Sequence, residues 1–156
     1  MIEIIFLGTG SMTPTKQRNH SGMLLKYKSE YILIDCGEGI QRQLRVADIS
    51  PTKITKVLIT HWHGDHVLGL PGLLQNLAAN KYQQTLEIYG PKGSKKNFKN
   101  MFSWFENKSF IKTKVTEIKS GFFYKDPEYK LQALPLKHSI PCLGYSFVES
   151  DKRKIN

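Results

Sequence analysis

The amino-acid sequence predicts one α/β domain in which helices cover a mixed β-sheet. Its 156 residues suit a single domain with a substantial core and are few for two domains. Short apolar runs alternate with segments of helical periodicity, an order that is typical of layered α/β folds. The apolar runs lead into polar turns, so we expect a functional site at one edge of the sheet.

The strands expected in the first part of the chain are short apolar runs that stop at glycine, proline or polar residues. They cover residues 2–7, 23–28, 31–35, 57–59 and 86–91. The first run ends at Gly8-Thr9-Gly10-Ser11, which predicts a tight loop. The second and third runs flank Ser29-Glu30, which predicts a hairpin.

Three helices are expected between these strands. The first follows a glycine-rich turn at residues 37–39, and its predicted apolar face consists of Ile40, Leu44 and Val46. The second follows residue 66, and its apolar stripe of period 3.6 consists of Leu70, Leu73, Leu74, Leu77 and Ala78. The third is expected over residues 92–107, with the inward-facing residues Phe98, Met101, Phe102 and Phe105.

The C-terminal third alternates apolar and polar residues and is predicted to form one antiparallel set of strands. These strands cover residues 113–118, 121–124, 129–136 and 145–148, with interruptions at Pro135 and at residues 137–141. The last residues are polar. We therefore expect one structural unit over residues 1–150 and a polar tail over residues 151–156.

The net charge of +10 is unevenly distributed, because residues 1–78 carry +2 and residues 79–156 carry +8. Such a surplus favours a polyanionic partner such as nucleic acid, but a lysine-rich solvated surface explains it equally well. No apolar run approaches the length that spans a bilayer, and the N-terminus lacks the features of a signal peptide, so we expect a cytoplasmic protein without membrane contact. Cys36 and Cys142 are expected to be buried thiols.

The most informative stretch is His61-Trp62-His63-Gly64-Asp65-His66, which lies between a predicted strand and a predicted helix. In an extended segment His61 and His63 point the same way and can hold one ion. His138 is the candidate third ligand, and three imidazoles with a water form an open zinc site. Asp65 and His66, beyond the bend, would begin a second metal position.

This stretch resembles the H-x-H-x-D-H signature of the metallo-β-lactamase fold, and the chain closely resembles the ribonuclease Z family within it. That family removes the 3′ trailer from precursor tRNA. Further similarity is carried by residues 6–10, by the basic loop at residues 14–19, and by residues 33–39 and 137–145. The resemblance implies an αβ/βα sandwich, of which this chain supplies about the first half as a mixed sheet with helices on its outer face.

The resemblance also implies roles for individual residues. His61, His63 and His138 would hold the first of two zinc ions, and Asp65 and His66 would contribute to the second, with Asp65 also the candidate general base. Asp35 and Glu38 would support the site without binding metal. The substrate-binding candidates of the basic loop are Lys16, Arg18 and Asn19.

The chain lacks the family's bridging aspartate and final histidine ligand, which lie in a second half. We therefore expect one retained zinc, an inactive chain in isolation, and an exposed apolar sheet face that a homodimer partner or the missing C-terminal half would cover. Residues 151–154 resemble the start of the family's tRNA-gripping arm.

The function expected from these features is zinc-dependent endonucleolytic removal of the 3′ trailer of precursor tRNA. Two alternatives remain open at this point. One is a non-catalytic module that binds metal or RNA, suggested by the missing ligands. The other is a hydrolase of the same superfamily with a different substrate, against which the basic loop at residues 14–19 argues.

Overall fold

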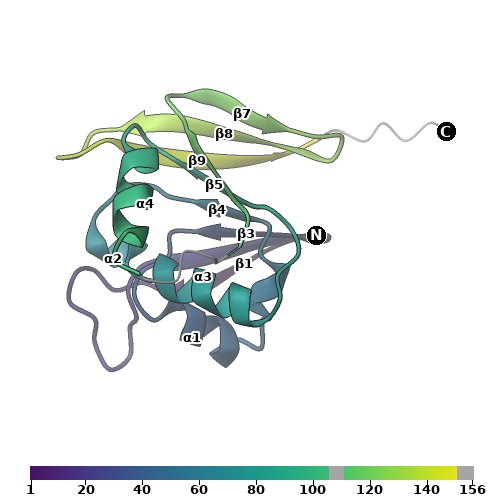
Figure 1. The fold of residues 1–156 in the computed structure, drawn as a ribbon. Coiled ribbons are helices and arrows are strands. Elements are labelled where there is room, and N and C mark those ends of the chain that lie inside the picture. Colours follow the sequence, from purple (N-terminus) through teal and green to yellow (C-terminus); the bar gives the residue numbers. More distant parts are fainter. Residues whose placement is uncertain (106–110, 151–156) are drawn as a thin grey trace.

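The computed structural model describes residues 1–105 and 111–150 and forms three layers (Figure 1). Helices cover one face of a six-stranded sheet, and a separate three-stranded sheet lies against the other face. The predicted tail at residues 151–156 lies outside the described residues. Within the described part of the chain, no helix is long and apolar enough to cross a membrane.

The six-stranded sheet contains the strands of the first two thirds of the chain. They are β1 (Ile2–Gly8), β2 (Gly22–Tyr27), β3 (Glu30–Ile34), β4 (Lys56–Leu58), β5 (Leu86–Gly90) and β6 (Thr113–Glu117), in this spatial order. The first three strands pair antiparallel, which confirms the predicted hairpin, and β3 to β6 pair in parallel. Because β1 runs in the same direction as β3, the carboxyl ends of β1, β3, β4, β5 and β6 meet at one edge of the sheet.

The three-stranded sheet is antiparallel and has the order β7-β8-β9. Its strands are β7 (Gly121–Lys125), β8 (Tyr129–Leu136) and β9 (Cys142–Glu149). The predicted single antiparallel set was therefore wrong in its first member, because β6 pairs in parallel with β5 in the other sheet. Alternation marks a half-buried strand but not its direction, and β6 is half-buried because it lies at a sheet edge.

Pro135 lies inside β8 and does not interrupt it. It is opposite Leu143 of β9, and the pairing of β8 with β7 has already ended at Ala133. Proline is tolerated there because that side of the strand has no ladder partner to which a backbone N–H would donate.

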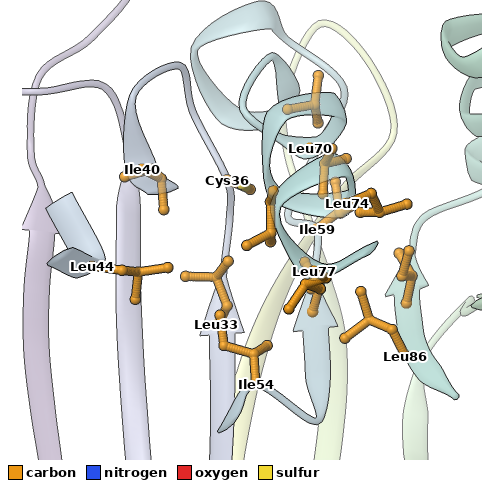
Figure 2. Packing of buried hydrophobic residues seen from close by; sticks show 14 of the residues in the cluster. Leu33, Cys36, Ile40, Leu44, Ile54, Ile59, Leu70, Leu74, Leu77 and Leu86 are labelled. Atoms are coloured by element: carbon orange, nitrogen blue, oxygen red, sulfur yellow. The ribbon is translucent and has the colours of Figure 1, made fainter. Parts of the chain in front are cut away.

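The helices pack on one face of the six-stranded sheet. They are α1 (Ile40–Val46), the short α2 (Gly64–Val67), α3 (Leu70–Ala79) and α4 (Ser94–Phe102), with a 3₁₀ turn, η1 (Pro51–Lys53). Figure 2 shows the core between α1, α3 and the sheet, in which Leu44, Leu70 and Leu77 contribute fully buried side chains. The predicted stripe of α3 is confirmed for its four leucines.

Two details of the helix predictions were wrong. Val46 is 65% exposed, because it lies about 200° around the helix from the buried Leu44. Helix α4 ends at Phe102, well before residue 107, and residues 106–107 lie outside the described part of the chain.

A second, aromatic core joins the two sheets. Tyr129 and Phe147 of the smaller sheet stack with their ring centroids 4.8 Å apart, and Tyr27 of β2 meets Phe147 edge-on at 5.1 Å. The buried Lys56 ammonium lies between the sheets, 2.8 Å from the Glu30 carboxylate and 4.4 Å from the centroid of the Tyr124 ring.

The expectation of an exposed apolar face holds only for the β1 side of the sheet. Three strands are too few to cover six, so Ile2, Ile4 and Phe6 of β1 are 41%, 52% and 69% exposed. A groove of about 320 Å³ runs between this side of the sheet and β8 and β9, and its lining is mostly apolar. An exposed apolar strip of this kind is typical of a surface that packs against further polypeptide.

The buried ion pair predicts a defined dependence of stability on pH. Burial raises the pKa of Glu30, but hydrogen bonds from Lys56 and Thr55 outweigh burial and leave the pKa lowered. The stabilisation is therefore present above the unfolded pKa of about 4.3 and is lost as the pH falls through the lower folded value. We expect Glu30→Gln to cost roughly 3 kcal/mol at pH 7, because it leaves the buried Lys56 with only Glu87 at 4.0 Å.

Urea denaturation of the wild type and of Glu30→Gln at pH 7 and below pH 4 measures this effect. The difference between the two proteins should shrink at the lower pH. Glu3→Gln, which removes the more exposed Lys26 pair, is the matched control and should cost less than about 1 kcal/mol. Equal losses for Glu30→Gln and Glu3→Gln, or a difference independent of pH, would contradict the assignment.

Candidate metal centre

The segment from His61 to His66, which we call the histidine turn, continues the chain from β4 beyond the edge of the sheet. The Ile59 N–H donates to the Tyr89 carbonyl at 2.8 Å, which continues the parallel pairing with β5 past the end of the strand. His61 follows, and His63 has an extended backbone (φ −76°, ψ 151°) directly before α2. His61 and His63 therefore lie in the extended segment that the sequence predicts, and their rings are 4.8 Å apart between centroids.

The structure brings His138 to the same point. One ligand nitrogen from each of His61, His63 and His138 lies within 4.8 Å of the others. His138 Nε2 is 3.3 Å from His63 Nδ1. Nitrogen ligands of a tetrahedral zinc are about 3.3 Å apart, so the three side chains fit a single metal ion. Within residues 1–105 and 111–150, these three side chains are the only such group of histidine, cysteine or carboxylate side chains.

Two hydrogen bonds hold the β8–β9 turn, and with it His138, against the histidine turn. The Leu143 N–H donates to the Thr60 carbonyl at 2.9 Å. The Tyr145 hydroxyl donates to the Ile59 carbonyl at 2.8 Å. Burial raises the pKa of Tyr145, which keeps this hydroxyl protonated as a donor. His138 is distant in sequence from His61 and His63, and these contacts hold its turn against the backbone that carries the other two histidines.

The Asp35 carboxylate orients two imidazoles of the site. It accepts hydrogen bonds from the Thr60 N–H at 2.8 Å, the Thr60 hydroxyl at 2.8 Å and His66 Nδ1 at 2.6 Å. The single hydroxyl proton of Thr60 is used on the carboxylate, so His61 Nδ1, 2.9 Å from Thr60 Oγ1, is the donor in that contact. In the neutral form of each imidazole, these contacts place the proton on Nδ1 and leave Nε2 as the atom that can bind a metal.

Asp65 and His66 form a pair beside His61, His63 and His138, which we call the histidine cluster. Asp65 Oδ2 is 3.4 Å from His66 Nε2, and the His66 ring centroid is 4.0 Å from that of His61. Asp65 is 7% exposed at the start of α2. The described residues contribute only these two groups at this second position.

The protonation of the two central imidazoles differs. Burial lowers the pKa of His61, and the neighbouring His66 lowers it further. Burial also lowers the pKa of His66, but the hydrogen bond and charge of Asp35 outweigh it and raise the pKa overall. His61 is therefore the readier of the two to act as a neutral ligand.

The glycine-rich turn at residues 37–39 packs tightly beneath the site. A Cβ on Gly37 would lie 2.3 Å from the Asp65 carbonyl oxygen, and one on Gly69 would lie 2.1 Å from the Gly37 carbonyl oxygen. The Cys36 N–H donates to the His66 carbonyl at 2.8 Å. Only glycine allows this close approach of the two backbones.

The basic loop leaves two of its three substrate-binding candidates at the surface. Lys16 and Arg18 are exposed, whereas the Asn19 side chain donates from Nδ2 to the Glu38 carbonyl at 2.6 Å. His20 is 5% exposed with Nε2 3.2 Å from the Met12 carbonyl oxygen, which leaves little surface for RNA. The Glu38 carboxylate lies 3.9 Å from His20 Nδ1 and contacts none of the predicted ligands.

Sequence reasoning missed Thr60 and Tyr145. Thr60 precedes His61, and a polar residue at the end of an apolar strand was the available signal for its role. Tyr145 acts through a hydrogen bond to a residue 86 positions away, which no local pattern reveals.

Comparison with known proteins identifies relatives over nearly the whole chain. The ribonuclease Z of Methanococcus aeolicus is 44% identical over 158 residues, which cover 99% of this chain and 49% of the relative. The ribonuclease Z of Pyrococcus horikoshii is 45% identical over 153 residues, covering 98% of this chain and 50% of the relative. The chain thus spans about half the length of the curated relatives it matches, and the resemblance expected from the motifs is confirmed.

Solved structures confirm the fold class. Human tRNase Z, short form, superimposes with a TM-score of 0.86 at 33% identity, covering 96% of this chain and 65% of the human chain. The metallo-β-lactamase fold protein YhfI from Bacillus subtilis superimposes with a TM-score of 0.77 at 20% identity, covering 94% of this chain and 58% of the other.

A family model described as "Anti-Pycsar protein Apyc1" matches residues 2–120, which is most of the chain. This match, the histidine turn and the superimposed structures together assign the chain to a family. The chain belongs to the family that this model describes, it has the metallo-β-lactamase fold, and the curated relatives compared above are ribonucleases Z.

Proposed function

We propose that this chain is the metal-binding part of a zinc-dependent endoribonuclease that removes the 3′ trailer from precursor tRNA. The observation that carries the proposal is the convergence of His61, His63 and His138 within 4.8 Å in a chain whose relatives are named ribonuclease Z. Human tRNase Z, at a TM-score of 0.86, supports the same substrate class.

Zinc is the proposed ion because its usual ligands match the donor set. Three imidazoles, with the proton of His61 held on Nδ1 by Thr60, suit an open four-coordinate site. Asp65 and His66 would contribute to a second ion whose remaining ligands lie outside the described residues. When bound, zinc lowers the pKa of a coordinated water and neutralises charge on the phosphodiester.

The residues of the chain have distinct proposed roles in orienting the histidines, in proton transfer and in RNA binding. Asp35 accepts hydrogen bonds from the Thr60 hydroxyl and from His66 Nδ1, and so keeps Nε2 of both His61 and His66 directed to the reaction site. Asp65, buried and adjacent to His66 Nε2, is the proposed general base that takes a proton from the attacking water onto a carboxylate oxygen. Exposed Lys16 and Arg18 attract the RNA backbone.

We propose that residues 1–150 form half of a two-sheet sandwich. The exposed apolar side chains of β1 and the groove between the sheets support this, as does coverage of half the length of the relatives. The partner is either further polypeptide equivalent to the remaining half of a ribonuclease Z or a second copy of the chain. The cytoplasmic location expected from the sequence stays a prediction.

Metal binding is the first test. The chain should bind roughly one zinc ion, and His138→Ala should lower zinc affinity about tenfold or more because it removes a ligand. Asp35→Asn removes no proposed ligand, yet should weaken binding about 10- to 100-fold, because Asp35 orients His61 through Thr60. Competition with a chromophoric chelator measures these affinities.

Lys137→Ala is the matched control, because Lys137 is exposed in the same turn as His138. It should leave zinc affinity unchanged. Zinc binding by His138→Ala equal to that of the wild type, with circular dichroism unaltered, would remove His138 from the site.

Cleavage is the second test. A polypeptide of these 156 residues should cleave precursor tRNA negligibly by itself, because its Asp65–His66 pair lacks further ligands among the described residues. Adding the part of the Methanococcus aeolicus ribonuclease Z that the alignment leaves uncovered should restore trailer removal. Asp65→Asn should then lower the rate about 100-fold or more.

The products are read on a denaturing gel against a marker for the mature 3′ end. Lys95→Gln, an exposed change on α4, is the control and should retain the restored rate. If the two polypeptides associate and bind zinc but do not cleave, the proposed activity is wrong.

A further inference from the structure

A second hollow lies at the same edge of the sheet as the histidine cluster. It has a volume of about 380 Å³ and lies where the end of β1, the basic loop and α1 meet. Its charged lining residues are Lys16 and Arg18 of the loop and Arg42 of α1. Arg42 is not among the substrate-binding residues that the sequence analysis proposes. We call this feature the basic hollow.

The basic hollow has a concentrated positive charge without a compensating carboxylate. No aspartate or glutamate lines it. Within the described part of the chain, Lys16, Arg18 and Arg42 take part in no ion pair. Three cations that share one cavity repel one another, and an anion with several oxygen acceptors relieves that repulsion.

The two walls of the hollow are fixed to each other. The loop is closed by hydrogen bonds from the Gly10 N–H to the Asn19 carbonyl at 2.7 Å and from the Arg18 N–H to the Thr15 hydroxyl at 3.0 Å. Asn19 then donates to the Glu38 carbonyl at 2.6 Å, two residues before α1 begins. Asn19 is therefore a positioning residue that ties the loop cations to the helix that carries Arg42.

The hollow and the histidine cluster are suitably spaced for one strand of RNA. The end of β1 lines the hollow, and the cluster follows β4, three strands away in the same sheet. Neighbouring strands are about 4.8 Å apart, so the ends of β1 and β4, from which the two sites are built, are about 14 Å apart along the sheet edge. A single-stranded backbone crosses such a distance in a few nucleotides.

We propose that Arg42 of α1 acts with the loop cations as a further binding residue, by contacting a backbone phosphate of the RNA that is cleaved at the histidine cluster. The inference rests on the proposed function and adds a binding residue and a location to it. Guanidinium groups bind phosphate oxygens in a bidentate manner, which gives Arg42 a role in fixing the backbone as well as attracting it.

The test compares two arginines of the same helix. Arg42 lines the basic hollow, whereas Arg45, also exposed, lines a different one beside Asp48. Binding of labelled precursor tRNA to the zinc-loaded chain is measured by fluorescence anisotropy across a salt titration. Arg42→Gln should weaken binding about fourfold at 0.15 M salt and lower the salt slope by about 0.7. Arg45→Gln, with the same change in net charge, should leave both unchanged.

Equal losses in Arg42→Gln and Arg45→Gln would attribute binding to overall charge and overturn the proposal, as would no loss in Arg42→Gln. Inorganic phosphate, added against chloride at equal ionic strength, distinguishes the source of the anion. Phosphate binding that is lost in Arg42→Gln, with precursor tRNA binding equal in Arg42→Gln and the wild type, would assign the hollow to free phosphate instead. A wild-type chain that binds zinc but no precursor tRNA would refute the proposed substrate. Binding of precursor tRNA that is unchanged in Arg42→Gln would refute only the role of Arg42.

Discussion

The candidate metal centre depends on the hydrogen bonds that the Asp35 carboxylate accepts. Asp35 lies at the end of β3 and accepts hydrogen bonds from Thr60 and His66, which belong to the turn after β4. It thereby joins two neighbouring parallel strands at the edge where the histidines emerge. Its backbone has a positive φ of 58°, an uncommon conformation for a non-glycine residue that aspartate tolerates better than most. One buried acidic group therefore orients His66 directly and His61 through Thr60.

The direction of the strands explains why distinct groups gather at one place. Parallel pairing from β3 to β6, with β1 running the same way, brings five carboxyl ends to a single edge. The histidine cluster and the basic hollow are both built on loops that leave this edge. The antiparallel β8–β9 turn supplies His138 from the other sheet, because the aromatic core and the bond from Tyr145 to Ile59 hold the two sheets together. The candidate site thus combines histidines from both sheets.

The same layering leaves apolar side chains at one side of the larger sheet exposed. The three-stranded sheet covers the central strands of the larger sheet, where Lys56 is buried against Glu30, but leaves the apolar side chains of β1 exposed. That strip, and coverage of half the length of the ribonucleases Z, point to the same arrangement of a second half against this one. The uncovered apolar strip is therefore a reason, separate from the metal ligands, for the second half that we propose.

The sequence by itself determined the chemistry of the site and most of the elements around it. The spacing of His61 and His63 on an extended segment, the leucine stripe of α3 and the first hairpin are local patterns, because strand and helix periodicities are set by nearby backbone geometry. Tertiary structure decided the rest. Whether β6 joined the first sheet, whether Val46 was buried and which hydroxyl fixed the His138 turn depended on contacts between distant residues. No local periodicity encodes these contacts, since the same alternating or amphipathic pattern is compatible with several partners.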